Sequence, residues 1–69
     1  MTKTEIKNEL VNAIGSPMAS KADLEKALNV GRKKVDQICA GLDFMRAGRK
    51  KLFLISDVAA RIAAEKSFN

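Results

Sequence analysis

The sequence predicts a mainly helical domain that carries one small β-hairpin. Two observations lead to this fold class. Apolar residues recur at helical spacing in separate segments, and a glycine inside a basic segment precedes an unbroken apolar run at residues 52–55. The 69 residues are expected to form one domain, residues 1–69. A chain of this size buries only about 60% of the surface that its unfolded form exposes, so a deep catalytic cleft is not expected.

The first helix is expected over residues 2–14. Thr2 and Glu5 have the spacing of a capping box, in which each side chain accepts a hydrogen bond from the other residue's backbone amide. From Ile6 onward, apolar residues recur every four positions on one face. Gly15 and the Ser-Pro pair after it end the helix. Because the charges of this segment balance locally, we expect it to support the fold and assign it no binding role.

Residues 20–41 predict two short helices joined by a sharp turn. Ser20 begins a second capping box. Asn29 marks the turn, because asparagine tolerates the left-handed conformation better than most residues. The next helix begins at Gly31 or Arg32. It carries a single apolar stripe, which consists of Val35, Ile38, Cys39 and Leu42.

Residues 42–55 predict the hairpin. Gly48 supplies the positive φ that a tight turn needs. Ala47 suits a two-residue type I′ loop poorly, so a slightly longer loop is an open alternative. In the apolar run that follows, the residues that point to either face of a strand are all apolar. This pattern predicts that helices cover both faces of the hairpin base. Phe44 and Phe53 are interpreted as core residues there, with stacking on bases as the alternative.

The last helix is expected over residues 56–66. Ser56 would be its N-cap, and Val58 and Ile62 would face the core. Its other apolar residues are the candidate surface for a protein partner or for self-association, and they are Ala59, Ala60, Ala63, Ala64 and Phe68.

The net charge of +5 is concentrated in one segment. Of 13 basic and 8 acidic residues, seven basic and two acidic ones lie within residues 31–51, so this segment accounts for the whole excess. Such concentration indicates a polyanionic partner. Several of these cations fall in the first turn of a predicted helix, where the macrodipole disfavours them. Local conflicts of this kind tend to mark functional sites.

Three segments resemble a known family. Residues 28–38, LNVGRKKVDQI, look like the turn and recognition helix of bacterial helix-turn-helix proteins. Residues 41–50, GLDFMRAGRK, are similar to the wing of the MerR-like excisionase group. Residues 57–62, DVAARI, match the acidic residue and apolar helix that close this motif. The resemblance covers about residues 19–63 and implies a winged helix-turn-helix fold.

The sequence departs from the family pattern at three positions. Glu25 stands where the family prefers a small residue at the helix crossing, which implies either tilted helices or an outward-leaning Glu25. Gly31 replaces the usual Ser or Thr cap, and Lys51 occupies a place that is often aromatic.

Membership of this family implies sequence-specific binding of double-stranded DNA. Small stand-alone members are recombination directionality factors of phages and mobile elements. Other members are transcriptional regulators or the DNA-recognition domains of phage packaging proteins. The missing effector domain favours an architectural role in DNA recombination or simple repression.

We hypothesise that the helix after the turn enters the major groove. Lys33 and Gln37 lie opposite the apolar stripe and would reach base edges, and Arg32 would contact a base or a phosphate. Lys34 would meet a phosphate. Asp36 would either accept a hydrogen bond from cytosine or pair with Lys33 three residues away, and we favour the second.

The hairpin cations are expected to contact phosphates or to enter the adjacent minor groove, and they are Arg46, Arg49, Lys50 and Lys51. Five or six neutralised phosphates would give a slope of log affinity against log salt of roughly −5. One domain reads only a few base pairs. We therefore expect a monomer that self-associates weakly on DNA or acts beside a partner protein.

The composition indicates no enzymatic, metal-binding or membrane function. The chain has no His and one cysteine, Cys39, which is interpreted as a packed core thiol. No catalytic residues, cofactor or metal are expected. No apolar run approaches the ~20 residues of a membrane span, and the expected location is cytoplasmic. Met18 and Met45 are interpreted as core gap fillers.

Two other classes of function remain open. One is a protein-interaction winged helix that docks on an acidic partner such as an integrase, another recombinase or a polymerase. It should leave an uncharged apolar patch exposed. The other is an RNA-binding module. RNA readers usually offer exposed aromatic residues, and this chain has three Phe and no Tyr or Trp, so we rank RNA last.

Overall fold

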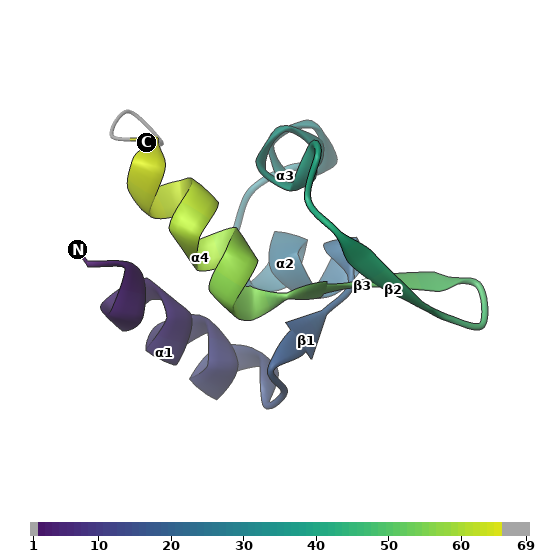
Figure 1. The fold of residues 1–69 in the computed structure, drawn as a ribbon, viewed down its shortest axis with the longest axis horizontal. Helices are drawn as coiled ribbons and strands as arrows, with labels where there is room; N and C mark the ends of the chain where they lie inside the picture. Colours follow the sequence, from purple (N-terminus) through teal and green to yellow (C-terminus); the bar gives the residue numbers. More distant parts are fainter. Residues whose placement is uncertain (1, 66–69) are drawn as a thin grey trace.

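The computed structural model describes residues 2–65. Within this part of the chain, four helices enclose the core and a three-stranded antiparallel sheet extends from it (Figure 1). In chain order the elements are α1 (Lys3–Ile14), β1 (Met18–Ala19), α2 (Lys21–Leu28), α3 (Arg32–Cys39), β2 (Phe44–Ala47), β3 (Lys50–Leu54) and α4 (Ile55–Ala64). The prediction of a mainly helical chain with a small hairpin is confirmed, and the sheet has one strand more than predicted.

The predicted capping boxes fix the N-termini of α1 and α2. The Glu5 amide donates to Thr2 Oγ1 at 3.1 Å, and the Thr2 amide donates to Glu5 Oε1 at 3.0 Å. Ser20 and Asp23 form the same reciprocal pair before α2, at 3.1 and 3.3 Å. Gly15 ends α1 with a φ of 82°. Local sequence therefore determines these boundaries.

Asn29 forms the turn between α2 and α3. Its φ of 55° and ψ of 47° place it in the left-handed region, and it is the only non-glycine residue with positive φ in residues 2–65. Its amide donates to the Glu25 carbonyl oxygen and closes α2. Gly31 then precedes α3 with extended backbone and no side-chain cap. The predicted turn and the start of α3 at Arg32 are confirmed.

The hairpin loop between β2 and β3 has two residues. Ala47 pairs with Lys50, so Gly48 and Arg49 form the loop, and the longer-loop alternative is wrong. Gly48 has a φ of 66°, whereas Arg49 does not have positive φ. This is the pattern of a type II′ turn, which needs glycine only at its first position and accepts alanine before it.

The additional strand, β1, pairs with the edge of β3 that β2 leaves open. The strand order is β1-β3-β2, with Met18 opposite Leu54 and Ala19 opposite Phe53. A strand of two residues shows no alternation of apolar and polar residues, so sequence periodicity carries no signal for it.

The predicted start of α4 at Ser56 is wrong. α4 begins at Ile55, its N-cap is Leu54, and no side chain caps it. The Ile55 amide donates to the Pro17 carbonyl oxygen at 2.9 Å, so the backbone before β1 satisfies one of the amides at the start of α4 that have no partner within the helix. Ile55 is also fully buried. The described helix ends at Ala64, and the last residue predicted for it, 66, lies outside the described residues.

The alanines of α4 contribute to the fold more than to the surface. α4 lies along α1 (Figure 1). Ala59 is fully buried, Ala60 and Ala63 are half-buried, and Ala64 is exposed. The expectation that these alanines form an exposed surface is therefore wrong for Ala59, which lies in the core. Phe68 lies outside the described residues.

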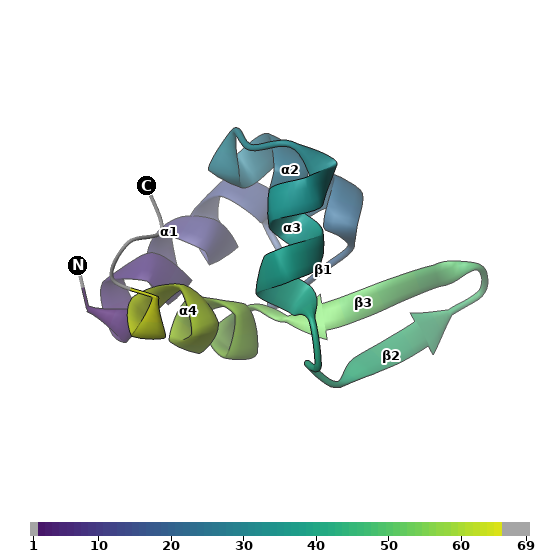
Figure 2. The ribbon, with the colours of Figure 1, turned by 90° about the horizontal axis from the view of Figure 1, so that it is seen from above.

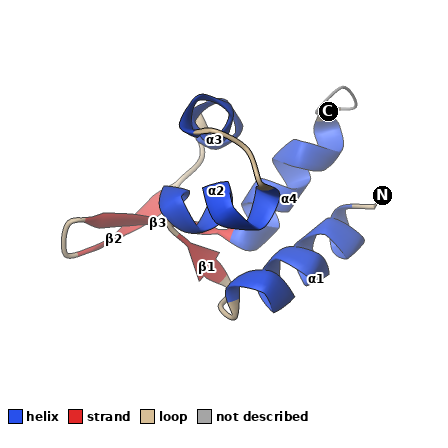
Figure 3. Ribbon diagram, turned by 180° about the vertical axis from the view of Figure 1, so that it is seen from behind, coloured by secondary structure: helices blue, strands red, loops and turns tan. Residues whose placement is uncertain are grey.

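The core lies between the helices and one face of the sheet. α2 packs against α3, β1 and β3, and α3 also contacts α4 (Figure 3). The largest fully buried side chains are Leu24, Val35, Ile38, Ile55 and Val58.

The other face of the sheet is not covered in the way that the sequence predicted. The strand pairing places Ala19 and Phe53 on the face that meets the core, and both are buried. Phe44 is 45% exposed, Met45 58% and Leu54 45%. The predictions of a base covered on both faces, of Phe44 as core and of Met45 as gap filler are wrong. The helices pack on one face only, and the hairpin extends beyond them (Figure 2).

Candidate nucleic-acid interface

The outward face of α3 carries Lys33 and Gln37. Val35 and Ile38 are fully buried, and helical periodicity turns positions 33 and 37 away from them. Both side chains are exposed. They lie four residues apart, so they follow one another along the same face of the helix. The structure places these two predicted base-reading residues as the periodicity indicated.

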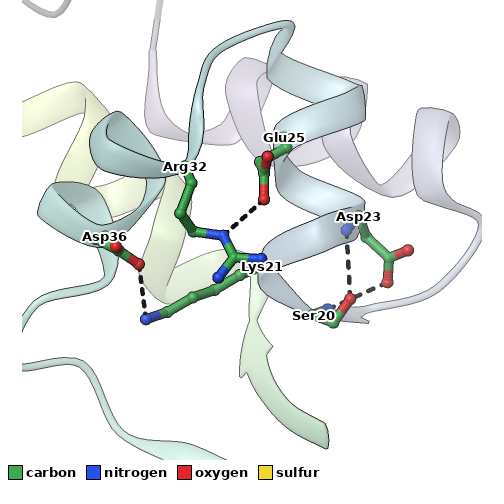
Figure 4. A network of polar contacts seen from close by, with 6 residues as sticks. All are labelled: Ser20, Lys21, Asp23, Glu25, Arg32 and Asp36. Atoms are coloured by element: carbon green, nitrogen blue, oxygen red, sulfur yellow. Dashed lines mark hydrogen bonds and ion pairs between the residues drawn. The ribbon is translucent and has the colours of Figure 1, made fainter.

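Two ion pairs connect α2 and α3 (Figure 4). Glu25 Oε2 accepts from Arg32 Nε at 2.8 Å, and Lys21 Nζ lies 2.9 Å from Asp36 Oδ1. Lys21 and Glu25 are one turn apart on α2, and Arg32 and Asp36 are one turn apart on α3. Each helix thus presents one acid and one base to its partner, and the pairs hold the two helices in one register. We call them the interhelical ion pairs.

The interhelical ion pairs change the roles predicted for two residues. Asp36 is paired, but with Lys21 and not with the predicted partner Lys33. Arg32 is not directed freely outward, because Glu25 holds its guanidinium against α2. The hydrogen bond to Glu25 raises the pKa of Arg32. Glu25 leans toward α3 and carries this contact.

The inner face of the hairpin carries Arg46 and Lys51. We define the inner face as the side of the sheet that bears Phe53 and the core. Arg46 pairs directly with Lys51 across the strands, and Phe44 pairs with Phe53, so all four lie on this face. Lys51 Nζ is 4.8 Å from the centre of the Phe44 ring, and the two phenylalanine rings are 5.9 Å apart. Phe44 therefore stabilises the Lys51 ammonium through a cation–π contact.

The remaining hairpin cations lie at its tip and on its other face. Arg49 is in the loop, and Lys50 shares the outer face with Ala47. Both side chains are exposed. Within residues 2–65 no ion pair involves Lys33, Arg46, Arg49 or Lys50. Lys34 is half-buried at the edge of the apolar stripe. α3 stands beside the base of the hairpin, and the hairpin extends away from the helices (Figures 1 and 2).

Arg61 is a residue of this region that the sequence did not indicate. Its Nη1 donates to the Ala40 carbonyl oxygen at 2.9 Å, immediately after the last residue of α3. A cation at a helix C-terminus satisfies open carbonyls and complements the dipole. Arg61 thus ties α4 to the junction between α3 and the hairpin. Its only sequence signal is a charge within an otherwise apolar segment.

The other features that could indicate a function are the single cysteine, possible metal ligands and long apolar helices. Cys39 is buried, and burial raises the pKa of its thiol, which matches the predicted core thiol. Residues 2–65 contain no group of three or more side chains that could hold a metal ion. No helix in this range combines the length and apolar character that crossing a membrane requires. Comparisons with protein-family models, with curated proteins and with solved structures found no match for this chain.

Proposed function

We propose that this chain is a winged helix-turn-helix that binds double-stranded DNA. α2 and α3 would form the helix-turn-helix, and β2 and β3 would form the wing. One observation carries the proposal. The entire net charge of +5 lies in residues 31–51, and these residues form α3, β2 and the start of β3. Five of their cations are exposed and have no ion pair among the described residues, namely Lys33, Arg46, Arg49, Lys50 and Lys51.

α3 lies in the major groove in this proposal. Lys33 reaches guanine and Gln37 reaches adenine, and each well-placed contact discriminates by about 1–3 kcal/mol. Arg32 contacts a phosphate only when it leaves Glu25. Asp36 stays with Lys21 and reads no base. The readout is therefore short, and useful specificity requires neighbouring copies or a partner protein.

The hairpin lies along the backbone or in the adjacent minor groove. Arg46 and Lys51 act from the inner face, and Arg49 acts from the tip. The Lys51 ammonium lies over the Phe44 ring, and this contact near the base of the hairpin favours a phosphate over a site deep in a groove. Narrow minor grooves attract arginine, so Arg49 is the residue that enters.

Within this function, an excisionase-like architectural factor or a small transcriptional regulator fits best. The support is the resemblance of residues 19–63 to the MerR-like excisionase group, and a cytoplasmic location follows from it. A DNA-packaging role shares the same interface.

Fluorescence anisotropy with a labelled random duplex tests the proposal. Binding should weaken with salt with a slope of about −4.5 on logarithmic axes, because five cations each contribute about 0.9. Arg49→Ala/Lys50→Ala should reduce the magnitude of the slope by about 1.8. The matched control is Lys3→Ala/Lys7→Ala, which removes equal charge from α1 and should leave the slope unchanged. Absence of binding at low salt by the folded protein contradicts the proposal.

A further inference from the structure

The outer face of the sheet carries a strip of four large apolar side chains. Met18 lies opposite Leu54, and Met45 lies opposite Leu52. Because side chains alternate along a strand, all four lie on the face opposite the buried Phe53. Met45 and Leu54 are largely exposed, and Met18 and Leu52 are half-buried. We call these four residues the outer apolar strip.

The exposure of the outer apolar strip is not explained by packing within the described chain. The three large apolar side chains that residues 2–65 expose most are Phe44, Met45 and Leu54. Phe44 contacts the Phe53 ring and lies under Lys51, so it has a role on the inner face. Met45 and Leu54 lie on the outer face, away from α2, which packs on the inner one. Contiguous exposed apolar residues rimmed by charge are typical of binding surfaces.

The charges around the strip define what covers it. Lys50 pairs with Ala47 and therefore lies on the outer face at the tip end of the strip, with Arg49 beyond it. Neither forms an ion pair within residues 2–65. The exposed Asp43 precedes β2 at the opposite end. A second copy stacked in the same direction would bring like charges to the tip, which opposes association. A copy stacked in the opposite direction would offer the two tip cations only one carboxylate, that of Asp43. A phosphate backbone has no apolar surface to match Met45 and Leu54.

We propose that the outer apolar strip is a docking site for a segment of another protein. The segment combines large apolar side chains, which cover Met45 and Leu54, with carboxylates placed toward Lys50 and Arg49. This inference goes beyond DNA binding and does not depend on it. Arg46 and Lys51 lie on the inner face and contact only DNA, whereas Arg49 and Lys50 at the tip serve both surfaces, so the partner and DNA would compete for the tip.

A selection from a surface-displayed library of short random peptides, carried out without DNA, tests this site. The wild-type chain is the target, and Met45→Ser/Leu54→Ser is the counter-target. Leu54 is the N-cap of α4, where serine is favoured, and Met45 is exposed, so the variant should fold. An ¹H–¹⁵N spectrum checks that it does. Enriched peptides should combine large apolar residues with Asp or Glu.

The selected peptides are then measured individually against variants. Affinity should fall about tenfold for Met45→Ser/Leu54→Ser and about threefold for Lys50→Gln. No enrichment, peptides without carboxylates, or equal binding to the counter-target would each overturn the proposal.

Two further measurements identify a different occupant. In sedimentation equilibrium, a dimer abolished by Met45→Ser/Leu54→Ser would mean that a second copy covers the strip. Flotation with phosphatidylglycerol vesicles, lost in the same variant, would mean that a lipid surface does. Either result overturns the proposal, and neither bears on DNA binding.

Discussion

Glu25→Gln should strengthen DNA binding and steepen its dependence on salt. In the structure Glu25 holds Arg32 through a hydrogen bond of 2.8 Å. Arg32 therefore contributes less to a DNA contact than its position in the first turn of α3 suggests. Glutamine has nearly the same shape but no charge, so its amide oxygen holds the guanidinium less strongly than the carboxylate does, and no side chain is lost from the contact between α2 and α3. A DNA phosphate can then take Arg32 from α2.

The size of the effect follows from the number of available cations. Wild-type binding brings five of them to the DNA, which are Lys33, Arg46, Arg49, Lys50 and Lys51, and each displaces counterions from nearby phosphates whether it lies on the backbone or in a groove. At about 0.9 per neutralised phosphate the slope is about −4.5, and addition of Arg32 brings it to about −5.4. The expected change is thus one phosphate contact. It is large enough to resolve in an anisotropy titration at several salt concentrations.

Two controls separate the release of Arg32 from a general change in charge. Glu9→Gln removes the same charge from an exposed position of α1 and should leave the slope at the wild-type value. Arg32→Gln in the Glu25→Gln background should return the slope to about −4.5. The reasoning is refuted if Glu25→Gln leaves the slope unchanged, or if its effect persists without Arg32.

Four further predictions concern the fold. Leu24→Ala should lower the free energy of unfolding by about 2–5 kcal/mol, a large part of the roughly 3–10 kcal/mol expected for this chain length. A decrease of less than about 1 kcal/mol, measured by urea denaturation, would contradict this. Arg61→Met should lower the free energy of unfolding by about 0.5–1.5 kcal/mol, because the hydrogen bond to Ala40 is lost. Amide hydrogen exchange should then become faster at the end of α3, and a change confined to α4 would contradict a role for Arg61 in holding α3. The hydrogen bond from the Thr2 amide lowers the pKa of Glu5 from its ordinary 4.5, so ionised Glu5 stabilises the start of α1 above that pH and this contribution is lost as the pH falls through the folded-state pKa. In an NMR titration the amide chemical shifts of Thr2 and Glu5 should change together, and Glu5→Gln should abolish that change. Cys39 is buried and its pKa is raised, so thiol reagents should label it only on unfolding, and rapid labelling of the native protein contradicts its core position.

The features that local sequence determined are those that a few neighbouring residues can form alone. The capping boxes at Thr2 and Ser20 and the left-handed residues at Gly15 and Asn29 were predictable, because their hydrogen bonds and backbone angles involve residues at most four positions apart. The apolar stripe of α3 was predictable for the same reason, and it placed Lys33 and Gln37 outward.

The tertiary structure decided which charges remain available. From the sequence, Asp36 had a suitable partner in Lys33, and the departure at Glu25 had two open explanations. The structure brings Lys21 and Arg32 to these carboxylates across the contact between α2 and α3. An ion pair between helices depends on their relative rotation and spacing. Periodicity within either helix does not contain that information.

Tertiary contacts also decided the edges and faces of the sheet. β1 exists because Met18 and Ala19 meet β3 from far along the chain, and α4 begins at Ile55 because a distant carbonyl accepts its amide hydrogen. The apolar run after Lys51 indicated burial but could not tell which face the helices would cover. The alternation of side chains along a strand defines two faces but does not say which one is buried. The packing of α2 on one face decides this and leaves Met45 and Leu54 exposed on the other.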